Sequence, residues 1–204
     1  MKKAIQIVLF LVIVVLGYIL VNSILTPLDF QNTTKAREAA VIERIKDIRT
    51  AQRAYKSVHQ RFTGSFDTLI NFVLNDSLVF EKAIGSADDS VAVAQGLVKR
   101  EKFNVAAIDT IFGDRKLTPE QIKNFRFIPY GNGKEYIMSA GDLATESKVV
   151  VPVFECKAPY KSFLIDLDQQ LLVNLIDDSK TLNRYPGIKV GSMTEATNEA
   201  GNWE

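Results

Sequence analysis

The sequence has few of the residues that carry most enzyme and metal chemistry. Its 204 residues include one cysteine and one histidine. A single cysteine excludes a disulfide framework and any thiolate zinc or iron–sulfur site within one chain. A single histidine excludes histidine-rich metal sites and relays of several imidazoles. We therefore expect no catalytic, cofactor-binding or metal-binding residues, and a protein that is not an enzyme.

The chain also lacks an excess of charge of either sign. Its 25 Lys and Arg residues oppose 24 Asp and Glu residues, which gives a net charge of +1. Nucleic-acid affinity needs a basic surplus concentrated on one surface, so a generic nucleic-acid binder is excluded. With 47% apolar residues, a chain of this length can form one domain with a sizeable core, or one domain and an appendage.

Charge is missing altogether from the segment between Lys3 and Asp29. Residues 5–25 are almost unbroken aliphatic, and 21 helical residues rise about 31 Å, which matches a hydrocarbon core of roughly 30 Å. A cleaved signal peptide is the alternative, but its apolar region is about 7–15 residues long and ends in a small-x-small site. Residues 21–26 contain no such site. We predict an uncleaved transmembrane helix over residues 5–26, preceded by a stub of residues 1–4.

The flanking charges predict the orientation of this span. Positive charge next to a span tends to stay in the cytoplasm, so Lys2 and Lys3 place the N-terminus inside, while the other flank has no base before Lys35. Without the two lysines the chain holds 23 bases against 24 acids, so its outer part has no surplus that would attract anionic lipid or nucleic acid. We expect a single-pass protein of the inner membrane of a bacterium, with its C-terminal domain in the periplasm.

An amphipathic helix is predicted over residues 27–60. Pro27 is expected to close or kink the span, and Thr33 or Thr34 to cap the next helix. Apolar residues then recur at three- and four-residue steps, at Val41, Ile45, Ile48, Ala51, Tyr55 and Val58.

This apolar stripe has two interpretations, the core of the domain or a bundle with another chain. Val41, Ile45 and Ile48 lie nearer the membrane than Val58. Because we expect the domain to cover only the distal half of the helix, we predict that these three residues contact a partner helix, from another copy or a different subunit. Val58 is expected in the domain core.

Residues 61–186 are predicted to form an α+β domain with a small antiparallel meander packed on the long helix, and residues 187–204 a polar tail. Ser65 is expected to cap a short helix through Val73, and Thr118 with Gln121 to form a capping box. Residues 77–116 indicate only two irregular or helical pieces and a loop. Alternation from Phe125 onward predicts a hairpin over residues 125–138 and further strands over residues 148–156, 161–166 and 171–176.

Two groups of residues are candidates for a site, one catalytic and one for a cation. Cys156 and His59 would form a thiolate–imidazolium pair only if the fold brought them together, and a buried inert thiol with a surface histidine is the ordinary interpretation. Asp166 and Asp168 offer two carboxylates to a divalent cation, but calcium takes six or more oxygens, so an acidic pair beside a turn is favoured and cation binding stays open. Further acidic pairs are interpreted in the same way, at 177–178 and 88–89.

The order of these segments resembles a known family. A basic N-terminus, one apolar helix, a proline near its end, an amphipathic continuation and a C-terminal antiparallel sheet are similar to type IV pilins and the pseudopilins of type II secretion. The segment 47–56 followed by 61–65 looks like the end of the pseudopilin helix and its turn. The family's peptidase site, a glycine before Phe or Met with a glutamate shortly after, is absent, so no functional residue is carried over.

This resemblance implies a non-enzymatic structural or assembly subunit of a pilus-like or secretion-like complex that crosses the envelope. Its partners would be the membrane and proteins or further copies of itself, with no nucleic acid and no evident small-molecule substrate. The alternatives are a membrane-anchored periplasmic binding module and a tethered hydrolase.

Overall fold

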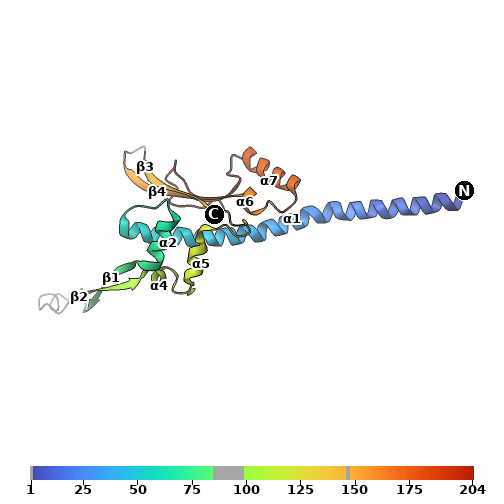
Figure 1. Cartoon of the computed structure of the whole chain (residues 1–204). Coiled ribbons are helices and arrows are strands. Elements are labelled where there is room, and N and C mark those ends of the chain that lie inside the picture. Colours follow the sequence, from blue (N-terminus) through green and yellow to red (C-terminus); the bar gives the residue numbers. More distant parts are fainter. Residues whose placement is uncertain (1, 85–98, 146–147) are drawn as a thin grey trace.

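The computed structural model describes residues 2–84, 99–145 and 148–204. It is an α+β structure built around one helix, α1, which runs without interruption over Lys2–His59. Its 58 residues rise about 87 Å at 1.5 Å per residue. The first half of α1 stands free and the second half passes through the domain (Figure 1). The predicted class is confirmed in this form, a long apolar N-terminal helix joined to small antiparallel sheets.

Pro27 does not end the helix, contrary to our expectation. The helix continues through Pro27, and Thr34 lies deep inside it with its side chain buried, so no second helix starts there. Proline removes one backbone donor, a loss of one hydrogen bond that a long helix withstands when both flanks are held. On the domain side, that support comes from packing, which begins with Phe30 and Thr34.

The apolar stripe of α1 is the core of the chain's own domain. Val41, Ile45 and Ile48 are 0% exposed, which contradicts the prediction that they face a partner. Val58, expected in the core, is 46% exposed. The reason is that the domain encloses α1 from more than one side. The elements that pack on it are β5 (Gly187–Gly191), α2 (Phe66–Asn75), α4 (Ala107–Phe112) and η1 (Asn124–Arg126). The domain therefore reaches much closer to the free half of α1 than the sequence suggested.

A three-stranded antiparallel sheet of order β3-β4-β5 lies on one side of α1 (Figure 1). Its strands are β3 (Ile137–Ala144), β4 (Val150–Pro159) and β5 (Gly187–Gly191). β4 confirms the strand predicted over residues 148–156. Pro152 lies in the central strand, yet β5 pairs only with Glu155–Pro159, so the missing donor of Pro152 falls where β4 has one neighbour.

Two of the predicted strands are helices. Residues 161–166 and 171–176 fall mainly on α6 (Tyr160–Phe163) and α7 (Gln169–Thr181). Asp168 caps α7 by accepting the backbone N–H of Leu171 at 3.0 Å, and Leu172 and Ile176 are buried one turn apart. A short apolar run does not distinguish a strand from a helix by periodicity alone, which explains the error.

The expected polar tail is part of the fold. Its first residues form β5, and the backbone of residues 200–202 pairs with the outer edge of that strand. Asn202 accepts the backbone N–H of Lys189 at 3.0 Å and donates to the carbonyl of Gly187 at 2.8 Å. Pairing by the last residues thus covers one edge of the sheet.

The other side of α1 carries short helices and a two-stranded ribbon (Figure 1). Helix α2 (Phe66–Asn75) with Ser65 as its cap, and α5 (Pro119–Lys123) with its capping box, confirm the prediction. The ribbon pairs β1 (Ser77–Ile84) with β2 (Lys99–Ala106) and is followed by α4 (Ala107–Phe112). Two irregular or helical pieces were expected over residues 77–116. Among the described residues of that range, only α4 is helical. The predicted hairpin over 125–138 is reduced to η1 (Asn124–Arg126) and one bridge between Phe127 and Glu135.

A buried amide joins α1 to the segment that follows it. Gln52 is fully buried; its Nε2 donates to the carbonyl of Thr63 at 2.6 Å and its Oε1 accepts the Thr63 N–H at 3.1 Å. Both backbone groups of Thr63 would otherwise be buried without partners, which costs about 1–3 kcal/mol for each group. The amide thereby fixes how the chain reverses at the end of α1.

These positions predict opposite outcomes for two aspartate substitutions. Ile45→Asp should lower the free energy of unfolding by several kcal/mol, because it buries a carboxylate without a partner. Val58→Asp should change it by less than about 1 kcal/mol, because the side chain is half exposed. Denaturant unfolding of the full chain in detergent, followed by the fluorescence of Trp203, measures both. Equal destabilisation by the two changes would contradict the packing of α1 described above.

Candidate functional site

The free half of α1 presents an aliphatic surface along its whole length. Between Ile5 and Leu25 the large apolar side chains are 46% to 71% exposed, and no part of the described chain buries them. A soluble monomer does not keep a contiguous apolar surface of this size in water. The segment is long and apolar enough to cross a membrane, and its exposure distinguishes it from the core helix of a soluble domain. It is compatible with a membrane anchor.

The domain begins where this apolar run ends. Leu167 and Asp168, just before α7, line a groove of about 230 Å³ whose other side is formed by Thr26, Asp29, Phe30 and Thr33 of α1. The turn before α7 therefore lies against the first two turns of α1 that follow Leu25. No bare stretch of helix separates the apolar run from the domain.

Arg37 fixes this turn to α1. Its Nη1 donates to the carbonyl of Phe163 at 2.7 Å, and its two terminal nitrogens contact the carboxylate of Asp166 at 2.5 and 2.7 Å. The guanidinium holds the pKa of the Asp166 carboxyl below its usual range. A fork of this kind fixes direction as well as distance.

Asp166 and Asp168, for which cation binding was left open, each have another partner in the fold. Asp166 is held by Arg37, and Asp168 caps α7, so neither carboxylate is free for a shared cation. The described part of the chain contains no group of three or more His, Cys, Asp and Glu residues placed to hold a metal ion. Asp177 pairs with Lys180 on the surface of α7 at 3.3 Å, and the pair at 88–89 lies outside the described residues.

Cys156 and His59 occupy different environments. Cys156 lies in the central strand of the sheet with no exposed surface, and burial raises the pKa of its thiol. His59 is the exposed last residue of α1. Its ring lies tilted against that of Tyr55, with 4.3 Å between the centroids, and meets Phe72 edge-on. A fully buried neutral thiol is a poor nucleophile, and the structure favours the ordinary interpretation of both residues.

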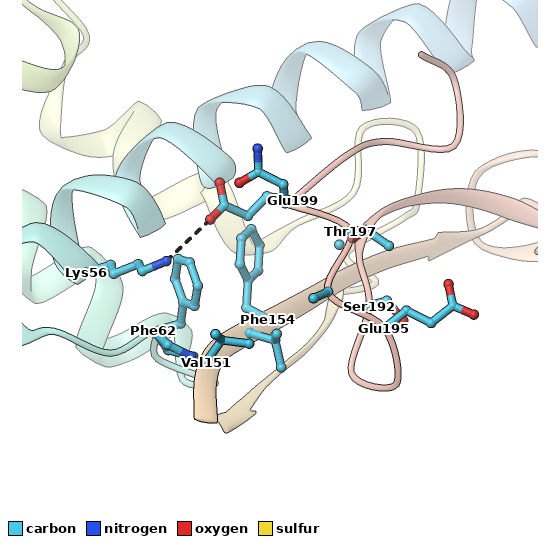
Figure 2. Close-up of a pocket in the computed structure, with 13 residues that line it drawn as sticks. Lys56, Phe62, Val151, Phe154, Ser192, Glu195, Thr197 and Glu199 are labelled. Atoms are coloured by element: carbon cyan, nitrogen blue, oxygen red, sulfur yellow. Dashed lines mark ion pairs between the residues drawn. The ribbon is translucent and has the colours of Figure 1, made fainter. Parts of the chain in front are cut away.

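A cavity of about 220 Å³ lies where the end of α1, β4 and the loop at 195–199 meet (Figure 2). The rings of Phe62 and Phe154 lie 4.8 Å apart at their centroids, and the Lys56 ammonium sits 4.6 Å from the centre of the Phe62 ring. The ammonium is also 3.8 Å from a carboxylate oxygen of Glu199. No histidine or cysteine lines the cavity, and its polar side chains include those of Lys56, Ser192 and Glu199.

An apolar surface at the far end of the domain was not predicted from the sequence. A groove of about 600 Å³ runs between the end of α1 and β1, with Val58, Val79, Phe80 and Ile111 among its lining. It continues onto β2, where Phe103 stacks on Phe80 with centroids 5.8 Å apart. We call these five residues the distal surface. The signal that could have found it is the alternation of apolar residues at 78 and 80 and again at 103 and 105, which a strand reading of 77–116 would have placed on one face.

Comparison of the chain with models of protein families, with curated proteins and with solved structures finds no match in any of the three. The site is therefore interpreted from its own residues.

The reactivity of Cys156 tests whether its thiol could act as a nucleophile. At neutral pH the native chain in detergent should not react with iodoacetamide over hours, because the thiol is buried and its pKa is raised. In denaturant it should react within minutes, which serves as the control. Mass spectrometry of the intact chain counts the adduct. Rapid alkylation of the folded chain would show a reactive thiolate and restore the tethered hydrolase as a candidate.

Proposed function

We propose that the chain is a non-enzymatic, single-pass membrane protein that serves as a structural or assembly subunit of a pilus-like or secretion-like complex crossing the cell envelope. The observation that carries the proposal is the continuity of α1, whose first half is exposed and aliphatic and whose second half is the core of the domain. A domain that only needs to be kept near a membrane can be tied to its span by a flexible linker. Here the same rigid element does both, so span and domain have a fixed relative position.

A fixed position is useful to a subunit whose contacts must repeat with one geometry. Many copies, or several different subunits, assemble only if each presents its surface in the same orientation to the next. A tethered binding module or hydrolase gains little from such rigidity. The pocket beside Phe62 and Phe154 is the one feature that favours the binding module, and it remains the second candidate.

The orientation of the proposal follows from the lysines at the N-terminus. Lys2 and Lys3 place the N-terminus in the cytoplasm, so the domain is periplasmic in a bacterial inner membrane. The near-neutral balance of the outer part, 23 bases and 24 acids, fits contact with proteins better than contact with polyanions.

We propose that partner proteins contact the distal surface, and not the middle of α1. Val41, Ile45 and Ile48 have no exposed area left for a partner. Phe80 and Phe103 remain partly exposed as a stacked pair on a ribbon that projects from the end of the domain (Figure 1). Aromatic side chains of this kind dominate the energetics of protein interfaces.

Purification from native membranes in mild detergent tests the assembly role. The wild-type chain should migrate as part of a complex larger than the monomer in a native gel. The double change Phe80→Ser and Phe103→Ser should release a folded, membrane-bound monomer, because it removes the aromatic pair without touching the core. The matched control, Val149→Ser and Val150→Ser, alters two apolar residues elsewhere that are more exposed than the phenylalanines, and it should keep the complex.

Two results would count against the proposal. A wild-type chain that is already a lone monomer would favour the binding module. A complex that survives the change of both phenylalanines would show that the distal surface is not its contact.

A further inference from the structure

We propose that the segment 165–170, which joins α6 to the first turn of α7, lies in the lipid headgroup layer on the side of the membrane where α1 emerges. We call this segment the membrane-facing turn. The inference rests on the proposed function in one respect, since it takes residues 5–25 as the part of α1 inside the hydrocarbon. It adds a second membrane contact, made by the domain itself.

The turn lies beside the part of α1 that directly follows the apolar run. Leu167 and Asp168 share a groove with residues of α1 between Thr26 and Thr33. At 1.5 Å per residue, the groove from Thr26 to Thr33 spans about 10 Å along the helix axis, and its part from Thr26 to Phe30 spans about 6 Å. The headgroup layer on each side of a bilayer is about 5–8 Å thick, so this nearer part of the groove falls within it. A span that ends at Leu25 therefore brings the turn to the depth of the headgroups. In Figure 1, α7 is the helix of the domain nearest to the free half of α1.

The turn is held in this place by three sets of hydrogen bonds. Arg37 donates hydrogen bonds to the carbonyl of Phe163 and to the carboxylate of Asp166, which directly precedes the groove residue Leu167. Gln169 donates to the carbonyls of Ile165 and Leu167 at 2.6 and 3.1 Å, which closes the turn on itself. Asp168 caps α7. Since α1 is continuous and the turn is bonded to it, the turn does not swing away from the membrane without breaking these contacts.

The composition of the turn suits a wet interface between water and hydrocarbon. Ile165 follows two fully buried residues, yet it is 47% exposed. Polar side chains lie beside it at Gln169 and Gln170, both exposed. Side chains that combine an apolar part with a polar part are favoured at the level of the headgroups.

The charges near the turn predict the class of lipid. Asp29 and Asp168 face the groove, Asp166 is neutralised by Arg37, and Lys35 and Lys161 are the exposed bases nearby in sequence. No basic cluster is present among these residues, so the contact does not depend on anionic lipid. We therefore expect the turn to contact the headgroups of a zwitterionic phosphatidylcholine bilayer.

Tryptophan quenching by brominated lipid tests the proposal on the full chain. In a Trp203→Phe background, single tryptophans are introduced by Phe10→Trp in the span, Gln170→Trp in the turn and Val150→Trp at the far end of the sheet, all at exposed positions. The chains are reconstituted in phosphatidylcholine vesicles whose acyl chains carry bromine close to the glycerol. We expect Phe10→Trp and Gln170→Trp to lose at least half of their fluorescence relative to unbrominated vesicles, and Val150→Trp to lose less than a tenth.

The three variants test the span and the membrane-facing turn separately. If Phe10→Trp is quenched and Gln170→Trp is as bright as Val150→Trp, the membrane-facing turn is overturned and the span is kept. If Phe10→Trp is not quenched, the proposed span itself fails. If Gln170→Trp is unquenched and its emission shifts to the blue as protein per vesicle rises, a second copy of the chain covers the turn in place of lipid, which also overturns the inference.

Discussion

The structure depends on one constraint, that a single helix must be the apolar rod at one end and the centre of the core at the other. Val41, Ile45, Ile48 and Ala51 have no exposed area, and the sheet and the short helices close around them. Burying a large aliphatic side chain is worth about 1.5–3 kcal/mol, so these few positions account for a large share of the stability of a small domain. The second half of α1 cannot unwind or swing out without dissolving the domain.

The same constraint links the core to the exposed apolar half of α1. Arg37 ties the turn before α7 to the helix, and Gln52 ties the loop after the helix, so both ends of the embedded half are bonded to the layers around it. The domain and the exposed apolar half of α1 are therefore joined through one helix, which lacks the backbone donor of Pro27. The distal surface therefore has a fixed position relative to the exposed apolar half of α1, which is the property that the proposed assembly role would require.

The parts predicted correctly from the sequence depend on local signals. The apolar run, the capping box at Thr118 and the strand containing Pro152 are each read from neighbouring residues, and the structure contains all three elements. The errors came from tertiary context. Nothing local says that Ile45 is enclosed from several sides, and the apolar run after Asp168 fits a strand as well as a helix until its cap is known. The distal surface was missed because residues 77–84 and 99–106 were not recognised as strands.

The continuity of α1 through Pro27 is the central claim and can be measured directly. With Cys156→Ala, spin labels at Ile19 and Ala39 stand 20 residues apart, on either side of Pro27, which is about 30 Å along a straight helix. Pulsed electron paramagnetic resonance in vesicles should give one narrow distance distribution near that value. Its width should match that of a reference pair of labels at Ala39 and Ser57, both in the half of α1 that passes through the domain. A broad or clearly shorter distribution for the first pair alone would mean that the helix breaks at Pro27 and that span and domain are not rigidly joined.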